Sequence, residues 1–258
     1  MKITALVENT SNSPAIGAEH GLSLYIEANG KKILFDMGQS DLFAKNAETL
    51  GIDLAQVDLA VLSHGHYDHG GGLKRFLGLN GKAPVYINRY AFEPHYNGTE
   101  KYIGLDPELK NDRRLRYAGN TEVIGDGLTL LTFNDRKKIF ELGSFGLNTL
   151  EYGKFVPDDF RHEQYLLIEE DGKRVLLSGC SHKSILNIAK WAEADVLIGG
   201  FHFSKLQPGK TLAEYARFLD RFDTAYYTCH CTGTEQFEFM QGYMHRLSYL
   251  SAGQTITV

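Results

Sequence analysis

Apolar residues along the chain follow two spacings, one typical of strands and one typical of helices. Near the amino terminus, "KITALVEN" and "LSLYIEANGKKILFDMG" read as strands, and Asn29-Gly30 in the second stretch predicts a hairpin turn. Residues 40–51 then carry apolar side chains at helical spacing and end at Gly51. We therefore expect a strand meander followed by a helix.

From residue 57 onward the pattern changes to a short apolar run, a polar tip and a helical stretch. "VDLAVL" is apolar almost throughout, as in a strand buried on both faces, and "LKRFLG" follows its polar tip as a helix. The same order recurs three times in the carboxyl half, at "RVLLSGCSH", "DVLIGGFHF" and "TAYYTCHCTG", each before a helical stretch. This alternation predicts an α/β fold in which helices cover sheets.

Two stretches between these units have a different pattern of polar and apolar residues. Residues 89–120 are polar, rich in tyrosine and poor in periodicity, which predicts a lid or insertion. Residues 121–150 return to short alternating runs that predict antiparallel strands. Because no Pro-rich or Ser-rich linker divides the chain, we expect residues 1–258 to form a single domain.

Composition limits the class of protein. The 258 residues are 43% hydrophobic and 23% charged, with a formal net charge of -5, so the chain is globular and lacks the cationic excess of a nucleic-acid binder. It has no apolar run of about 18 residues and no secretory signal pattern. Its three cysteines make no disulfide framework. We expect a cytoplasmic protein that binds neither nucleic acid nor membrane, and the sequence leaves its oligomeric state open.

The stretch "LSHGHYDHGGG" concentrates potential metal ligands at the first strand tip. His64 and His66 are two residues apart, so on an extended backbone they point to the same side, where they can hold one ion. Asp68 and His69 follow where the chain turns, and they can hold a second ion. The other three tips also carry histidine, namely His182, His202 and His230. Because the carboxyl ends of strands meet at one edge of a sheet, these side chains can converge.

The motif His64-x-His66-x-Asp68-His69 at the end of a strand resembles the signature of the metallo-β-lactamase superfamily. The similarity extends to "ILFDMG", which contains Asp36, and to the tip "VLLSGCSH". The segments "SGCSHKSILNI", "IGGFH" and "HCTG" resemble those of the branch of this superfamily that includes the dihydropterin ribofuranosylaminobenzene phosphate synthase. The resemblance implies an αβ/βα four-layer sandwich of two mixed sheets flanked by helices.

The resemblance also implies a dinuclear metal site. His64 and His66 would bind the first metal, and Asp68 and His69 the second. His230 falls where the superfamily supplies another ligand of the second metal, and we assign His182 to the first. Two divalent ions are expected, with zinc as the leading choice and iron or manganese as alternatives.

Two departures from the superfamily pattern leave ligands open. The usual Gly-His-Thr motif is replaced by "DDFRHEQYLLI", so His162 competes with His182, and Asp158 and Asp159 are poorer candidates. Cys180 stands where a bridging aspartate is usual, and it either ligates or lines the site. By strand alternation, Cys229 and Cys231 would point away from His230 and pack in the core.

The implied reaction is hydrolysis by a metal-activated water, which attacks a carbonyl or phosphoryl centre of a small molecule. Asp68 would orient the water, and His202 could protonate the leaving group. A phosphate-bearing ester or related bond is favoured if nearby cations converge on the site. These cations are Lys183, Lys205, Arg113, Arg114 and Arg116.

Three other functions remain open from the sequence. One is a pterin-precursor synthase of the dihydropterin ribofuranosylaminobenzene phosphate type, as the named branch suggests. Another is a diiron redox protein or a metal-binding sensor, which would hold metal without hydrolysis. A nuclease is disfavoured by the acidic charge balance.

Overall fold

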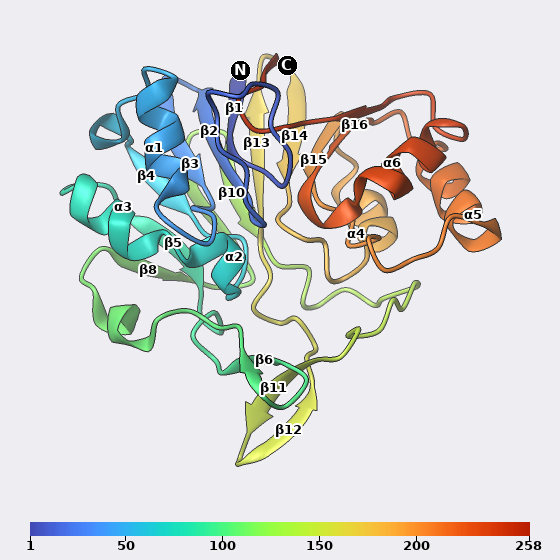
Figure 1. The fold of residues 1–258 in the computed structure, drawn as a ribbon, viewed down its shortest axis with the longest axis horizontal. Helices are drawn as coiled ribbons and strands as arrows, with labels where there is room; N and C mark the ends of the chain where they lie inside the picture. The colour runs from blue at the N-terminus through green and yellow to red at the C-terminus, as the bar shows by residue number, and fades with distance from the viewer.

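The computed structural model describes residues 1–258, and its centre is a pair of seven-stranded mixed sheets packed face to face (Figure 1). The first sheet, in spatial order, consists of β18 (Thr255–Thr257), β1 (Lys2–Val7), β2 (Ser23–Ala28), β3 (Lys31–Phe35), β4 (Leu59–Val61), β5 (Val85–Asn88) and β8 (Leu115–Ala118). The second consists of β17 (Leu247–Tyr249), β16 (Ala225–Thr228), β15 (Val196–Gly199), β14 (Lys173–Leu177), β13 (Tyr165–Glu170), β10 (Leu128–Leu131) and β9 (Thr121–Gly125).

Helices cover the outer face of each sheet, with α1 and α3 on one side and α4, α5 and α6 on the other (Figure 1). The helices are α1 (Leu42–Thr49), α2 (Tyr67–Gly70), α3 (Leu73–Leu79), α4 (Ile185–Ala192), α5 (Lys210–Leu219) and α6 (Thr234–Gln241), with 3-10 turns η1 (Leu54–Gln56), η2 (Pro107–Asn111) and η3 (His230–Thr232). None of the helices has the length and apolar character needed to cross a bilayer.

Three apolar clusters hold these layers together. Buried residues of both sheets, such as Leu24 and Ile198, form the cluster between the sheets. Phe43 of α1 and Phe76 of α3 pack on the outside of the first sheet, and Leu212 of α5 belongs to the cluster outside the second. Burial of apolar area of this kind is the main stabilising contribution. The four-layer αβ/βα sandwich expected from the sequence is confirmed.

The amino-terminal meander forms as its turn residues predict. β2 and β3 pair antiparallel, and Asn29 and Gly30 between them have φ of 49° and 68°. Two consecutive left-handed residues are the requirement of a type I′ hairpin turn, which Asn-Gly satisfies. The expected hairpin is therefore present.

Residues 89–120 contribute to two sheets. β6 (His95–Asn97) and β7 (Lys101–Tyr102) join β11 (Leu147–Glu151) and β12 (Lys154–Pro157) in a small sheet at the bottom of Figure 1. β8 pairs parallel with β5 and forms the edge of the first large sheet. The segment that the sequence predicts as a lid or insertion thus includes one strand of the main scaffold.

The parallel strands set up the functional edge of the molecule. In the first sheet β3, β4 and β5 run parallel, and in the second β14, β15 and β16 do so. Their carboxyl ends lie at the same edge, where α/β folds bind ligands. The histidine-bearing tips follow β4, β14, β15 and β16.

Candidate metal centre

The strand tips bring the predicted ligands together in two buried groups. We call one the Asp68 group, with donor atoms within 4.8 Å of one another; it consists of Asp68, His69, Cys180 and His230. We call the other the three-histidine group; it consists of His64, His66 and His182. All seven side chains are buried, although they come from three separate segments of the chain.

The donor atoms of the Asp68 group have the spacing of a tetrahedral metal site. His69 Nε2 lies 3.2 Å from both Cys180 Sγ and His230 Nε2. Asp68 Oδ2 lies 3.4 Å from His230 Nε2 and 3.9 Å from His69 Nε2. Bonds of about 2.0–2.3 Å to one tetrahedral ion would put such donors about 3.3–3.6 Å apart. Three of these four distances are within about 0.2 Å of those values, and all four donor atoms lie within 4.8 Å of one another, so the group is compact enough to surround a single metal ion.

Hydrogen bonds fix both imidazoles of this group with Nε2 toward the centre. His69 Nδ1 lies 2.7 Å from Oδ2 of the buried Asp36 carboxylate, to which it donates. His230 Nδ1 donates to Asn9 Oδ1 at 2.9 Å. With the proton on Nδ1, the lone pair of Nε2 is free to coordinate. Partners of this kind are typical around metal-binding histidines.

The three-histidine group presents buried nitrogen atoms that lack a partner. Its ring centroids lie 4.6–5.0 Å apart. Nε2 of His64, Nε2 of His66 and both ring nitrogens of His182 are buried without a hydrogen bond. Since a buried polar atom without a partner costs about 1–3 kcal/mol, such a concentration indicates atoms reserved for a ligand. A divalent metal ion fits this donor set.

Ser63 orients His64. The Ser63 hydroxyl donates to Asp36 Oδ2 at 2.7 Å, so its oxygen is left to accept from His64 Nδ1 at 2.8 Å. His64 therefore carries its proton on Nδ1, and Nε2 is free. Asp36 thus orients His69 directly and His64 through Ser63.

The electrostatics favour the deprotonated form at four of the candidate ligands and oppose it at His69 and Cys180. Burial lowers the pKa of His69, but the Asp36 and Asp68 carboxylates outweigh it and raise that pKa; burial raises the pKa of the Cys180 thiol well above its usual range. Burial, reinforced by the neighbouring histidines, holds the pKa of His64, His66 and His182 well below the usual range. Burial alone would raise the pKa of Asp68, but His69 and hydrogen bonds from His20 and His230 hold it well below its usual range. Neutral imidazole and ionised carboxylate are the forms that bind metal.

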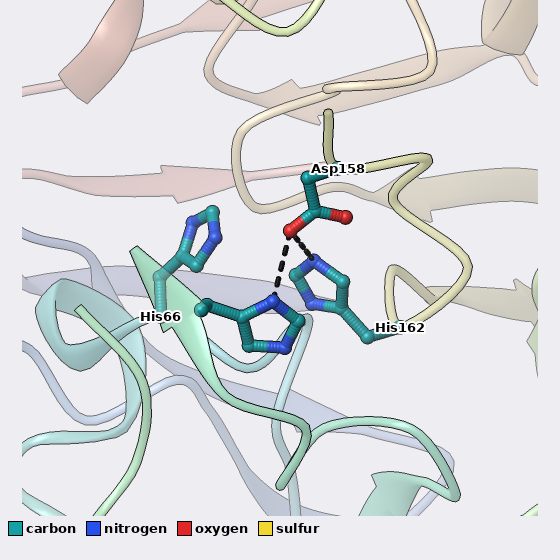
Figure 2. Close-up of side chains that lie close together, drawn as sticks. His66, Asp158 and His162 are labelled. Carbon is teal, nitrogen blue, oxygen red and sulfur yellow. Dashed lines mark hydrogen bonds and ion pairs between the residues drawn. The ribbon is translucent and has the colours of Figure 1, made fainter. Parts of the chain in front are cut away.

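A third buried cluster lies beside His66 (Figure 2). His95 Nδ1 of β6 lies 2.8 Å from Asp158 Oδ2, and His162 Nε2 lies 3.3 Å from the same oxygen. The His66 ring lies 5.4 Å from the His95 ring and 5.1 Å from the His162 ring. The burial of Asp158 opposes its ionisation, but the two histidines hold its pKa well below the usual range.

The backbone decides the tautomer of His162. The Gly65 N–H donates to His162 Nδ1 at 2.9 Å, so this nitrogen must carry a lone pair. In a neutral imidazole the proton then sits on Nε2, which lies 3.3 Å from Asp158 Oδ2 but makes no hydrogen bond of good geometry. A nitrogen that carries a proton cannot coordinate a metal. With this tautomer His162 faces the Asp158 carboxylate, and it also belongs, with His66, His95 and Asp158, to a buried group of possible metal ligands whose donor atoms lie within 4.8 Å of one another.

Gly65 permits a close approach between two segments of the chain. A side chain there would meet the carbonyl oxygen of Ala91 at 2.2 Å. Only glycine lets residue 91 of the predicted insertion approach the chain between His64 and His66.

Cys231 lies closer to the site than strand alternation predicts. Its sulfur, Cys180 Sγ and a His202 ring nitrogen all lie within 4.8 Å of one another. The reason is local, because His230–Thr232 is the 3-10 turn η3, in which side chains do not alternate. Cys229 does pack in the core between the sheets, as expected.

His202 adjoins the three-histidine group. Its ring lies 4.4 Å from the ring of His182, and its Nδ1 is buried without a partner. Phe160 also stacks on His182, with centroids 4.4 Å apart and an angle of 8°. Asp159 is exposed and lies outside both groups of predicted ligands.

The predicted cations do not converge as a set. Lys183 is buried beside the site, where burial lowers its pKa to about 8 although the Glu163 carboxylate opposes this shift. Arg114 instead donates to backbone carbonyl oxygens of Leu77 and Asn80 on the far side of the first sheet. Arg113 and Arg116 are exposed and line none of the main cavities.

Two small cavities adjoin the site. One, of about 290 Å³, is lined by Phe160, His182 and Lys183, and another of about 360 Å³ shares Lys183 with it. The largest cavity, about 700 Å³, lies between α1, η1 and α3 and is lined by no histidine. The cavity of about 290 Å³ is the better candidate for a substrate site, because a candidate ligand, His182, is in its lining.

Comparison with known proteins agrees with this geometry. The family model described as "Metallo-beta-lactamase superfamily" matches residues 16–220. The chain belongs to the metallo-beta-lactamase superfamily. It is a metal-dependent hydrolase of this superfamily, as the sequence predicts.

Individual relatives cover nearly the whole chain. Uncharacterized protein MJ0448 of Methanocaldococcus jannaschii is 32% identical over 90% of each chain. The 7,8-dihydropterin-6-methyl-4-(beta-D-ribofuranosyl)-aminobenzene-5'-phosphate synthase of the same organism is 30% identical over 99% of this chain and 96% of its own. The crystal structure of Tm1679, a metal-dependent hydrolase of the beta-lactamase superfamily, has a TM-score of 0.85 at 30% identity, covering 100% of this chain and 99% of its own.

Several supporting residues lie outside the sequence-based interpretation. His95 is fully buried in the third cluster, although its polar surroundings in the sequence suggest an ordinary surface residue. Asn9 orients His230, and His20 Nε2 lies 3.1 Å from Asp68 Oδ2. Only Asp36 carried a signal, because it belongs to "ILFDMG", which resembles the superfamily pattern.

Proposed function

We propose that the chain is a dinuclear, zinc-dependent hydrolase of a small phosphate-bearing molecule. The observation that carries this proposal is the pair of donor groups, one with four donor atoms at tetrahedral spacing and one with three imidazoles lacking partners. Imidazole and thiolate donors favour zinc, with iron and manganese as the alternatives.

The two groups suit different tasks. The Asp68 group supplies four protein donors, including Cys180, and so would close a tetrahedral ion. The three-histidine group supplies three donors and leaves a position for water or substrate, as catalytic zinc sites do. We assign His182 to this group, because His162 directs its protonated nitrogen to Asp158.

The bound ions would supply activation of water and stabilisation of negative charge on the substrate. The chain supplies orientation. Asp36, through its bonds to Ser63 and His69, holds one imidazole of each group. Asp68, which accepts from His20, presents an ionised oxygen that can orient the attacking water.

His202 is the proposed proton donor for the leaving group. It is half-buried next to His182, and its partner-free Nδ1 makes it available to a substrate atom. We also propose a cytoplasmic protein with a small-molecule partner, because its three cysteines are all free and buried.

The test is elemental analysis of the purified protein, followed by hydrolysis assays with and without metal. The proposal expects two zinc ions per chain and turnover of phosphate-bearing esters that is lost on chelation and restored by zinc. One metal per chain would refute the dinuclear site. Stoichiometric metal with no hydrolysis would favour the sensor, and visible iron absorption would favour the diiron alternative.

A second candidate function is a synthase that acts on a pterin precursor. The relative named as such a synthase matches this chain over nearly its whole length. Turnover with a pterin diphosphate and an aminobenzene ribotide would support this function. Hydrolysis of simple esters together with inertness toward that pair would count against it.

A further inference from the structure

The two small cavities next to the metal centre are neighbours that share part of their lining. Both are lined by Lys138, Asp159 and Lys183. The first cavity, about 290 Å³, extends to His182 and Phe160, and the second, about 360 Å³, extends away from the ligands. Each has a volume near the lower limit of about 300 Å³ for a small-molecule site.

Lys183 lines both cavities and keeps one donor free. Its side chain is almost fully buried, and Nζ donates to the carbonyl oxygens of Thr132 at 2.7 Å and Glu163 at 3.0 Å. An ammonium group has three N–H donors, so these bonds leave one. A buried charged donor that lines a cavity is a natural partner for an anionic ligand.

The second cavity contains further cations that are not neutralised. Arg136 makes no ion pair, and Lys138 reaches only the backbone oxygen of Asp159, at 3.5 Å. Arg161 also lines the cavity, but Glu93 and Glu151 already hold its guanidinium. In the lining of the second cavity Lys183, Arg136 and Lys138 therefore outnumber the one acidic side chain, Asp159, whereas the first cavity also has Glu141 and Asp158 in its lining.

Other groups of the second cavity suit an organic ligand. Phe133 and Tyr90 offer aromatic surface, and the side chains of Asn120 and Tyr90 line the cavity without a hydrogen bond to another protein group. The cavity thus combines apolar contact with donors for an oxyanion. Few convergent polar groups in a partly apolar lining are typical of small-molecule sites.

We propose that Lys183, Arg136 and Lys138 form a subsite for the phosphate of a phosphate monoester, whose bond to be cleaved lies toward His182. The inference rests on the proposed function, since it places the non-reacting end of that substrate. Phosphate held at Lys183 would leave the rest of the molecule to extend along Phe160 to the three-histidine group.

The test is calorimetric titration of the zinc-loaded protein with phenylphosphonate, a phosphate-monoester analogue that cannot be hydrolysed. Arg136→Ala and Lys138→Ala should each weaken binding about tenfold, the effect of losing one charge-assisted hydrogen bond. Arg116→Ala is the matched control, because it removes an exposed arginine outside both cavities and should leave the affinity unchanged. Metal content, measured on every variant, should stay constant.

Lys183→Met should weaken binding further, and because this buried change can disturb folding, the two surface variants carry the test. Unchanged affinity in both surface variants, with binding that disappears on zinc removal, would mean that the phosphonate binds the metals and would overturn the subsite. This titration needs no turnover. An inactive protein with intact phosphonate binding would refute the proposed hydrolase and leave the subsite standing.

Discussion

Replacement of His182 by alanine should remove the metal ion of the three-histidine group and leave that of the Asp68 group. Four-ligand zinc sites bind with about 10–16 kcal/mol, so one imidazole contributes about 2.5–4 kcal/mol, or about 100- to 1,000-fold in affinity. Both ring nitrogens of His182 lack a partner, so the metal-free fold loses no hydrogen bond in the variant. Elemental analysis after dialysis against graded zinc buffers should give one tightly bound ion per chain where the wild type has two.

His162→Gln is the matched control for this prediction. Glutamine offers an oxygen that can accept from the Gly65 N–H, as His162 Nδ1 does. The variant should retain both ions, because His162 presents a protonated nitrogen to Asp158. Two ions in His182→Ala and one in His162→Gln would refute the assignment and the tautomer reasoning together.

Three other outcomes follow from the site. His66→Ala should abolish hydrolysis and empty the three-histidine group while the circular dichroism spectrum stays native; wild-type turnover in metal-free buffer would contradict the hydrolase. Asp36→Asn should lower the zinc affinity of the Asp68 group about 10- to 100-fold, measured by competition with a chelator, because His69 loses a carboxylate acceptor. Asparagine tolerates the left-handed φ of 60° at this position, so the backbone should not change. An unchanged affinity would show that this bond does not support the ligand. The metal-free protein should lose stability between pH 7 and pH 5, because its buried histidines stay neutral while the unfolded chain takes up protons near pH 6.5. Each such histidine changes the free energy of unfolding by up to about 1.4 kcal/mol per pH unit. A free energy of unfolding in urea that stays constant over this pH range would rule this out. The histidines with lowered pKa are His64, His66, His162 and His182.

The sequence predicts the scaffold and the position of the histidine tips because both depend on local patterns. Continuous apolar runs identify β4, β14, β15 and β16, and the rule that strand ends share an edge brings their tips together. The spacing of His64, His66, Asp68 and His69 by itself predicts metal ligands. None of these steps needs a contact between distant segments to be known in advance.

The supporting residues could not be predicted in the same way. His95 lies in β6, whose polar sequence gives no apolar periodicity, and its partner Asp158 is more than 60 residues away. The choice between His162 and His182 depends on one backbone N–H, that of Gly65, which no pattern in the sequence reveals. Cys231 was misplaced because a 3-10 turn replaced the strand on which the alternation rule depends.

The close approach of the Ala91 carbonyl to Gly65 limits how this enzyme could be rebuilt. The loop that carries two candidate ligands rests against the segment before β6 on one side and donates to His162 on another. If residues 89–120 were replaced by the equivalent segment of a distant relative, the contact between residue 91 and Gly65 that helps to position this loop would change. Chimeras of such proteins should therefore exchange the loop that carries His64 and His66, residues 89–120 and the segment that contains His162 together. Otherwise the distances between the imidazoles would change.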